Sequence, residues 1–108
     1  MLLVCRNPDG SETKIRVKTI THAPPVTIGR GKEAAIQVDD AKCSRVHSAI
    51  RYWDDIFIIR DMHSSNGTFV NGEKIEVCRL APGDVVKIGD TELQLEPEAN
   101  PTDATMRG

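Results

Sequence analysis

Short stretches of alternating polar and apolar residues recur along the chain and are separated by turn-forming residues. Lys14–Ile20 and Thr91–Leu95 show the alternation most clearly, and a period of two indicates strands with one buried face. Turn signals interrupt the pattern roughly every 8–12 residues, and no long window has a helical period. The pattern predicts roughly ten or eleven short strands, at Met1–Cys5, Lys14–Ile20, Val26–Ile28, Ala35–Val38, Ser48–Trp53, Ile56–Arg60, Thr68–Val70, Glu73–Ile75, Cys78–Leu80, Val85–Ile88 and Thr91–Leu95.

Many short strands without helices are typical of an all-β fold, and we expect an antiparallel β-sandwich. The chain has 108 residues, a length that suits one domain with a modest core. We expect residues 1–96 to form that domain. From Pro97 onward the sequence is polar and poor in large apolar residues. Residues 97–108 are therefore predicted to be a disordered tail or a linker.

Composition and charge argue against nucleic acids and membranes as partners. The formal net charge is −2 and only 4% of the residues are aromatic, so neither a basic field nor a stacking platform favours a nucleic-acid partner. No apolar run approaches the length of a membrane span, and we expect no membrane contact. The sequence leaves the oligomeric state open.

The three cysteines are too widely spaced for a familiar metal or disulfide pattern. Cys5, Cys43 and Cys78 form no C-x-x-C pair, and the three histidines do not fall at metal-ligand spacing from them. We therefore expect no metal site, no cofactor and no disulfide. Reduced thiols indicate a cytoplasmic protein. Cys5 and Cys78 lie in apolar runs and are predicted to be core residues.

One polar loop stands out for the chemistry that it carries. Two Asn-Gly pairs, at residues 66–67 and 71–72, bracket the short strand Thr68–Val70, and Asn-Gly favours positive φ and tight turns. Ser64, Ser65 and Asn66 form the tip of the first loop. Hydrogen-bonding side chains on a loop held by strands are a common form of binding site. Asp61 is expected to close this loop as a hydrogen-bond acceptor.

Two further polar loops, residues 29–32 and 42–47, also connect predicted strands. Loops at one end of a sandwich gather together. If these three loops meet, they place several cations and hydroxyls on one rim, at Arg30, Lys32, Lys42, Arg45, Ser44 and Ser65. A phosphate ester suits such a rim, because it carries about −1.5 to −2 charge and three strong acceptor oxygens.

An ordered set of short motifs extends from residue 26 to residue 95. It comprises Gly29-Arg30, Ser44-Arg45-x-His47, Asp61-x-x-Ser64-x-Asn66-Gly67-Thr68-x-x-Asn71-Gly72, Leu80-x-x-Gly83-Asp84 and Ile88-Gly89. In order and spacing this set resembles a forkhead-associated (FHA) domain. The resemblance implies an eleven-stranded sandwich that binds phosphothreonine peptides through loops at one end, without catalysis. Such a module belongs to Ser/Thr kinase signalling.

The resemblance also implies residue roles. Arg30 and Ser44 correspond to residues that contact phosphate, Arg45 to a neighbour that approaches it, and Ser65 to a position that commonly holds Thr. Asn66 corresponds to the amide that bonds the peptide backbone.

Other matched positions are expected to shape or support the site. Asn71 corresponds to a second amide that steadies the loops or touches the peptide. Gly29, His47 and Gly67 are expected to support the loops.

Peptide selectivity must come from residues beyond the phosphate cage. Lys42 and His63 flank the matched motifs, and we expect Lys42 to favour an acidic residue C-terminal to the phosphothreonine. The partner is then a phosphothreonine-containing protein, such as a Ser/Thr kinase substrate. Thr102 or Thr105 of this chain's own tail is another candidate ligand.

Three alternatives remain. The fold could serve as an assembly module without phosphate recognition. A Ser44–His47 nucleophile and base would indicate an esterase or phosphatase, but no third orienting group is apparent. Trp53 and Tyr52 could form an exposed patch, although packing against the core or an edge is the simpler expectation.

Overall fold

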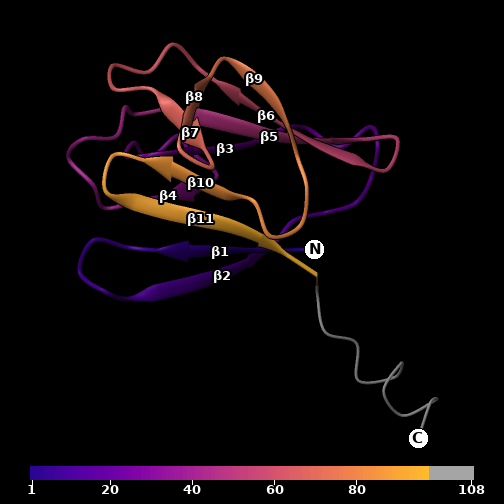
Figure 1. Cartoon of the computed structure of the whole chain (residues 1–108), viewed down its shortest axis with the longest axis horizontal. Helices are drawn as coiled ribbons and strands as arrows, with labels where there is room; N and C mark the ends of the chain where they lie inside the picture. The colour runs from indigo at the N-terminus through magenta and orange to yellow at the C-terminus, as the bar shows by residue number, and fades with distance from the viewer. Residues whose placement is uncertain (98–108) are drawn as a thin grey trace, which may run out of the picture.

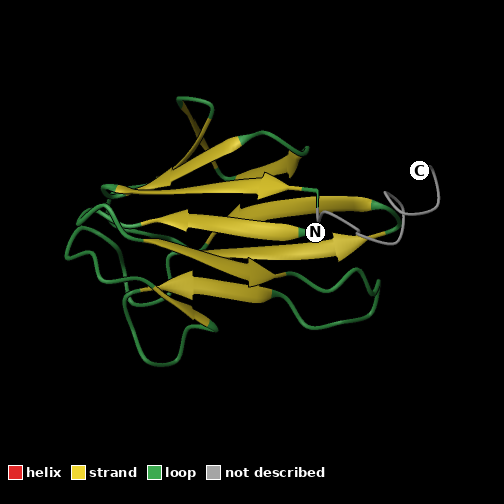
Figure 2. Cartoon of the chain, turned by 90° about the horizontal axis from the view of Figure 1, so that it is seen from below, coloured by secondary structure: helices red, strands yellow, loops and turns green. Residues whose placement is uncertain are grey.

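The computed structural model describes residues 1–97 as two facing β-sheets without helices (Figures 1 and 2). The strands are β1 Leu2–Arg6, β2 Glu12–Arg16, β3 Val26–Gly29, β4 Ile36–Gln37, β5 Ser48–Trp53, β6 Ile56–Asp61, β7 Thr68–Val70, β8 Glu73–Ile75, β9 Val77–Leu80, β10 Val85–Ile88 and β11 Thr91–Glu96. These strands confirm the prediction of an all-β sandwich with about eleven strands. No helix in this part of the chain is long and apolar enough to cross a membrane.

The six-stranded sheet has the order β2-β1-β11-β10-β7-β8, and the five-stranded sheet has the order β4-β3-β5-β6-β9. Every pair is antiparallel except β3 with β4, which run parallel. The long β5–β6 hairpin sets the register of the second sheet, with Ser48 opposite Asp61 and Trp53 opposite Ile56. The predicted purely antiparallel pattern therefore has one exception, at a two-residue strand on the sheet edge.

Apolar side chains from both sheets fill the space between them. Nine members of this core have at most 1% of their surface exposed: Leu3, Ile28, Val38, Ile50, Ile59, Val86, Ile88, Leu93 and Leu95. Fully burying one such side chain stabilises the fold by about 1.5–3 kcal/mol. Cys5 and Cys43 are also buried, whereas Cys78 is partly exposed and packs against the core. The sequence indicated Cys5 and Cys78 as core residues and missed Cys43.

Strand β2 is shorter than the alternation predicted. Pairing with β1 stops where Leu2 lies opposite Arg16, and the last link is the Val17 N–H, which donates to the Met1 carbonyl at 2.9 Å. Lys18–Ile20 therefore lie outside the strand, beyond the last backbone bond to β1. The predicted tail, residues 97–108, lies outside the described residues apart from Pro97, so the boundary at residue 96 stays a prediction.

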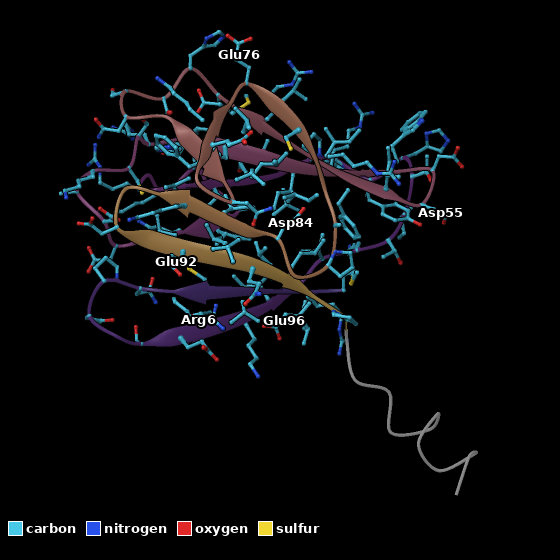
Figure 3. The ribbon with its side chains drawn as sticks, viewed as in Figure 1. Arg6, Asp55, Glu76, Asp84, Glu92 and Glu96 are labelled. Atoms are coloured by element: carbon cyan, nitrogen blue, oxygen red, sulfur yellow. The ribbon has the colours of Figure 1, made fainter. Side chains whose placement is uncertain are left out.

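The direction of the strands assigns each connection to one end of the sandwich. The loops after β3, β4 and β6 lie at the left-hand end in Figure 1, together with the β1–β2 and β10–β11 turns. The β5–β6 turn lies at the opposite end, where Figure 3 labels Asp55. The three polar loops singled out in the sequence therefore share one end.

Candidate functional site

The first two loops of this end are joined through their backbones. The Arg30 N–H donates to the Ser44 carbonyl at 2.9 Å, and the Gly31 N–H donates to the Arg45 carbonyl at 3.0 Å. Gly29 permits this approach, because a Cβ at that position would lie 2.1 Å from the Arg45 oxygen. A glycine is required here by close packing between backbones.

Ser44 and Ser65 connect the second loop to the third. The Ser65 N–H donates to the Ser44 hydroxyl oxygen at 3.0 Å. A serine hydroxyl can accept and donate at the same time, and the Ser44 hydroxyl has no recorded acceptor among residues 1–97. Its proton is therefore available to an incoming oxygen such as that of a phosphate.

Asn66 is oriented in a way that leaves one of its amide atoms available. Its Nδ2 donates to the Lys42 carbonyl at 2.7 Å, while no hydrogen bond to its Oδ1 is recorded in the described part of the chain. The amide oxygen of Asn66 can therefore accept a hydrogen bond from a backbone N–H of a bound peptide.

Arg30 is held at its base and exposed at its tip. Its Nε donates to the Cys43 carbonyl at 3.1 Å, and the residue as a whole is exposed. No partner is recorded within residues 1–97 for the two terminal nitrogens. That end of the guanidinium is the part that matches a phosphate in a fork-shaped contact.

Two of the predicted cations are already paired. Arg45 binds Glu33 through two contacts, of 2.8 Å from Nε to Oε1 and 3.2 Å from Nη2 to Oε2. Lys42 Nζ lies 3.0 Å from Asp90 Oδ2. From the sequence, both were expected to add positive charge to the rim. In the structure, Arg30 and Lys32 are the two loop cations that make no ion pair with residues 1–97. The rim is thus less positive than predicted.

His47 lies behind the loops and is completely buried. Its Nδ1 accepts the Ser44 N–H at 3.0 Å, and its Nε2 lies 2.7 Å from the Gly67 carbonyl oxygen. Since Nδ1 accepts, Nε2 carries the proton and donates it to Gly67. The contact to Ser44 is through backbone nitrogen, so Ser44 and His47 do not form a nucleophile and base.

Asp61 closes the third loop, as expected from the sequence. Its Oδ1 accepts the hydroxyls of Ser64 at 2.5 Å and Thr68 at 2.7 Å, and its Oδ2 accepts the Ser64 N–H at 3.1 Å. Burial by itself would raise the pKa of Asp61, but these hydrogen bonds outweigh it and hold the pKa below its ordinary value. Asp61 therefore stays an anion that faces the loop's own donors.

Asn71 is not brought to the other predicted contact residues. Its Nδ2 donates to Asp84 at 3.1 Å, and its Oδ1 accepts the Val85 N–H at 3.0 Å. Asn71 follows the last residue of β7, whereas Gly67 precedes the first, so they are about 13 Å apart along the chain direction. Figure 3 shows Asp84 away from the left-hand end of the molecule. Of the two roles considered for Asn71, these contacts favour the one of steadying a turn.

His63 is exposed and has a φ of 56°. It lines a surface hollow together with Asp61, Ser64, Lys74, Ile75 and Glu76. This hollow adjoins the third loop, so His63 could meet residues that flank a bound phosphothreonine. Its specificity role stays a prediction.

The described residues bear on two other possibilities, a metal site and an exposed aromatic patch, of which the patch is limited to Trp53 because Tyr52 packs against the core. Within residues 1–97, no group of three or more His, Cys, Asp or Glu side chains could hold a metal ion. Trp53 is 41% exposed, stacks edge-on with His22 and lies 5.1 Å from the Arg51 guanidinium. It belongs to the β5–β6 hairpin, at the end of the sandwich away from the polar loops.

Sequence reasoning missed two residues that shape the site, Glu33 and Asp40. Glu33 pairs with Arg45. The only feature of the sequence that could have indicated this pair is the position of an acidic residue close to the Gly-Arg-Gly turn. Asp40 is 5% exposed and accepts from the Lys42 and Asp90 N–H groups and from the Thr91 hydroxyl. These bonds join the second loop to the β10–β11 turn. The sequence could not indicate these bonds, because Asp40 and the β10–β11 turn are far apart in the chain and meet only in the folded structure.

Comparisons with known proteins agree with this fold. A sequence model of the FHA domain matches residues 26–89. The FHA domain-containing protein FhaA of Mycobacterium tuberculosis is 38% identical over 66 residues, which cover 61% of this chain and 12% of FhaA. The glycogen accumulation regulator GarA of the same organism is 36% identical over 93 residues, covering 86% of this chain and 54% of GarA. The chain thus spans about half the length of GarA.

A solved structure from a study of phosphothreonine-dependent FHA domain interactions superimposes with a TM-score of 0.73. Its sequence identity is 27%, and the alignment covers 93% of this chain and 100% of that one. The likeness therefore extends over most of the chain.

Proposed function

This chain belongs to the FHA domain family, and we propose that it is a phosphothreonine-dependent protein-interaction module. Its ligand is a phosphothreonine-containing segment of a partner protein, made by a Ser/Thr kinase. The module acts by binding and carries out no catalytic step. A cytoplasmic setting, in keeping with the expected reduced thiols, is part of the proposal.

The observation that carries this proposal is the contact between Ser44 and Ser65. The Ser65 N–H occupies a lone pair of the Ser44 oxygen and so leaves the hydroxyl proton for a ligand. The Arg30 tip comes from the adjoining loop, which is bonded to Ser44 through the backbone. A phosphate would meet a fork-shaped cation and a hydroxyl donor from separate loops, an arrangement that suits its several acceptor oxygens.

Asn66 would extend recognition from the phosphate to the peptide backbone. Its Oδ1 can accept a backbone N–H, so it favours a phosphate carried on an extended chain over free phosphate. Preference for threonine over serine requires burial of one methyl group, which is worth about 0.8 kcal/mol. Area alone therefore predicts a preference of several-fold.

The test begins with an oriented phosphothreonine-peptide library. The selected peptide and its unphosphorylated twin are then compared by calorimetry. We expect binding of the phosphorylated form only. Arg30→Ala and Ser44→Ala each remove one contact to a charged group, a loss of about 1.5–3 kcal/mol or roughly tenfold or more in affinity. Arg79→Ala, an exposed arginine on β9, is the matched control and should bind as wild type does.

The results separate the proposal from its rivals. Equal binding of the unphosphorylated twin would indicate an assembly module that uses the fold without phosphate. Release of inorganic phosphate from the peptide would indicate an enzyme. Wild-type affinity in both the Arg30 and Ser44 variants would show that the site is elsewhere.

A further inference from the structure

The phosphate-binding loops contain a carboxylate of their own. Glu33 lies in the first loop, and its two oxygens meet Arg45 of the second loop at 2.8 and 3.2 Å. Two parallel contacts of this kind are the geometry in which an arginine also binds a phosphate. Glu33 thus occupies the face of Arg45 that a phosphate would use.

The protein backbone makes room for this carboxylate. A Cβ at Gly31 would lie 2.5–2.8 Å from the three terminal atoms of Glu33, so any larger residue at position 31 would push the Glu33 side chain away. The Gly31 N–H also donates to the Arg45 carbonyl at 3.0 Å. The same glycine therefore joins the two loops and provides space for Glu33 against Arg45.

Both arginines of the site act on Glu33. The pKa of Glu33 is lowered to about 2, chiefly by the hydrogen bonds from Arg45 and then by a hydrogen bond from its own backbone, with smaller contributions from the charges of Arg45 and Arg30. Glu33 is consequently ionised at neutral pH and within electrostatic reach of both cations. The pair is open to solvent, with 71% of the Arg45 side chain and 45% of the Glu33 side chain exposed, so a stronger anion can displace Glu33 without unfolding anything.

We propose that Glu33 is an internal competitor for Arg45 that sets how strong an anion must be to use that arginine. This inference rests on the proposed function. A peptide Asp or Glu that displaces Glu33 only exchanges one arginine–carboxylate pair for another and gains nothing. A phosphate with nearly two negative charges gains a stronger contact in the same exchange. Glu33 therefore lowers the affinity for every anion that must displace it, and it leaves an acidic residue that imitates phosphothreonine with no net gain from Arg45.

Glu33→Gln tests this, because it keeps the shape of the side chain and removes the charge. The probes are the library-selected phosphothreonine peptide and the same peptide with Glu in place of phosphothreonine, each titrated by fluorescence anisotropy. We expect Glu33→Gln to tighten the phosphopeptide by about two- to fivefold, the range for loss of one exposed ion pair. The Glu peptide should tighten by no more than the same factor, because its contact with Arg45 is the weaker one. In an Arg45→Ala background the effect of Glu33→Gln should be much smaller.

Two further variants keep the result interpretable. Glu73→Gln removes the same charge from the start of β8, and it should leave both affinities unchanged. Gly31→Ala should displace the Glu33 side chain and reproduce the tightening, provided that its thermal melt shows a folded protein.

Three outcomes overturn the inference while the proposed function stands. They are unchanged affinity in Glu33→Gln, weaker binding in that variant, which would mean that Glu33 holds Arg45 in its binding position, and equal tightening by Glu73→Gln. If wild-type protein binds no phosphopeptide, the proposed function fails and this inference fails with it.

Discussion

His47 Nε2 donates a 2.7 Å hydrogen bond to the Gly67 carbonyl and thereby links the two sheets directly behind the candidate site. The two residues immediately precede β5 and β7, which belong to different sheets. The next residues along, Ser48 and Thr68, are also joined, by hydroxyls 2.7 Å apart. Thr68 donates to Asp61, so Ser48 must donate to Thr68. This buried polar chain fixes where the third loop begins and ends.

His47→Ala should lower both stability and binding. It leaves the Ser44 N–H and the Gly67 carbonyl without a partner and opens a cavity, a combined effect of about 2–4 kcal/mol on the free energy of unfolding. Urea denaturation measures this loss. His63→Asn is the control, since His63 is exposed and asparagine tolerates its positive φ. A His47 variant as stable as the control would contradict the bracing role.

Gly29→Ala should displace the second loop. The added methyl would lie 2.1 Å from the Arg45 oxygen and 2.9 Å from the Ser44 oxygen, and backbone atoms yield less readily than a side-chain end. We expect a loss of about 1–3 kcal/mol in stability and weaker phosphopeptide binding in calorimetry. Gly10→Ala measures backbone strain alone, because Gly10 has a φ of 90° and open space around it. It should cost about 1 kcal/mol and leave binding intact.

The strands were predictable from the sequence because each carries its own signal. Alternation and turn residues located β5, β6, β7 and β10 to within a residue, since a buried face and a tight turn depend on neighbours in the chain. The parallel pairing of β4 was not predictable in this way. It is a two-residue contact determined by where the chain returns after residues 30–35.

The residues that gather at the candidate site could be selected from the sequence, but their charge balance could not. Motif spacing identified Arg30, Ser44, Ser65 and Asn66, and the structure gathers these residues at one end. The motifs did not reveal that Glu33 pairs with Arg45, because Glu33 belongs to no motif. They also did not reveal that Asp90 pairs with Lys42, because the two residues are distant in the sequence. Asn71 matched the family pattern, yet its side-chain amide makes hydrogen bonds to Asp84 and Val85 at the turn before β10.

Asp61→Asn should destabilise the protein in a manner that depends on pH. The pKa of Asp61 in the folded protein lies below its ordinary value of 3.8, so folding favours the ionised form. This contribution is complete above that ordinary value and is lost as pH falls through the lower folded pKa. We expect a deficit of about 1–3 kcal/mol at pH 7 and a smaller one near pH 3. Urea denaturation at several pH values measures it, and a deficit that stays constant down to pH 3 would contradict this account.

Lys42 is expected to favour an acidic residue C-terminal to the phosphothreonine, and Asp90 should limit that preference. Lys42 Nζ lies 3.0 Å from Asp90 Oδ2, with both side chains more than half exposed, so this pair is weak and can exchange partners. In a phosphopeptide array, Lys42→Ala should remove the acidic preference. Asp90→Asn frees Lys42 and should increase the preference by about two- to fivefold, as expected for one exposed pair.

Lys42→Ala and Asp90→Asn each remove a charge but keep the backbone hydrogen bonds of these two residues. Asn66 bonds the Lys42 carbonyl, and Asp90 N–H bonds Asp40; both bonds use backbone atoms that survive the substitutions. Overall affinity for a peptide with neutral flanking residues should therefore stay near wild type in both variants. An acidic preference that persists in Lys42→Ala, or its absence from wild type, would remove Lys42 as a specificity residue. His63, beside the neighbouring hollow, would then be the next position to test.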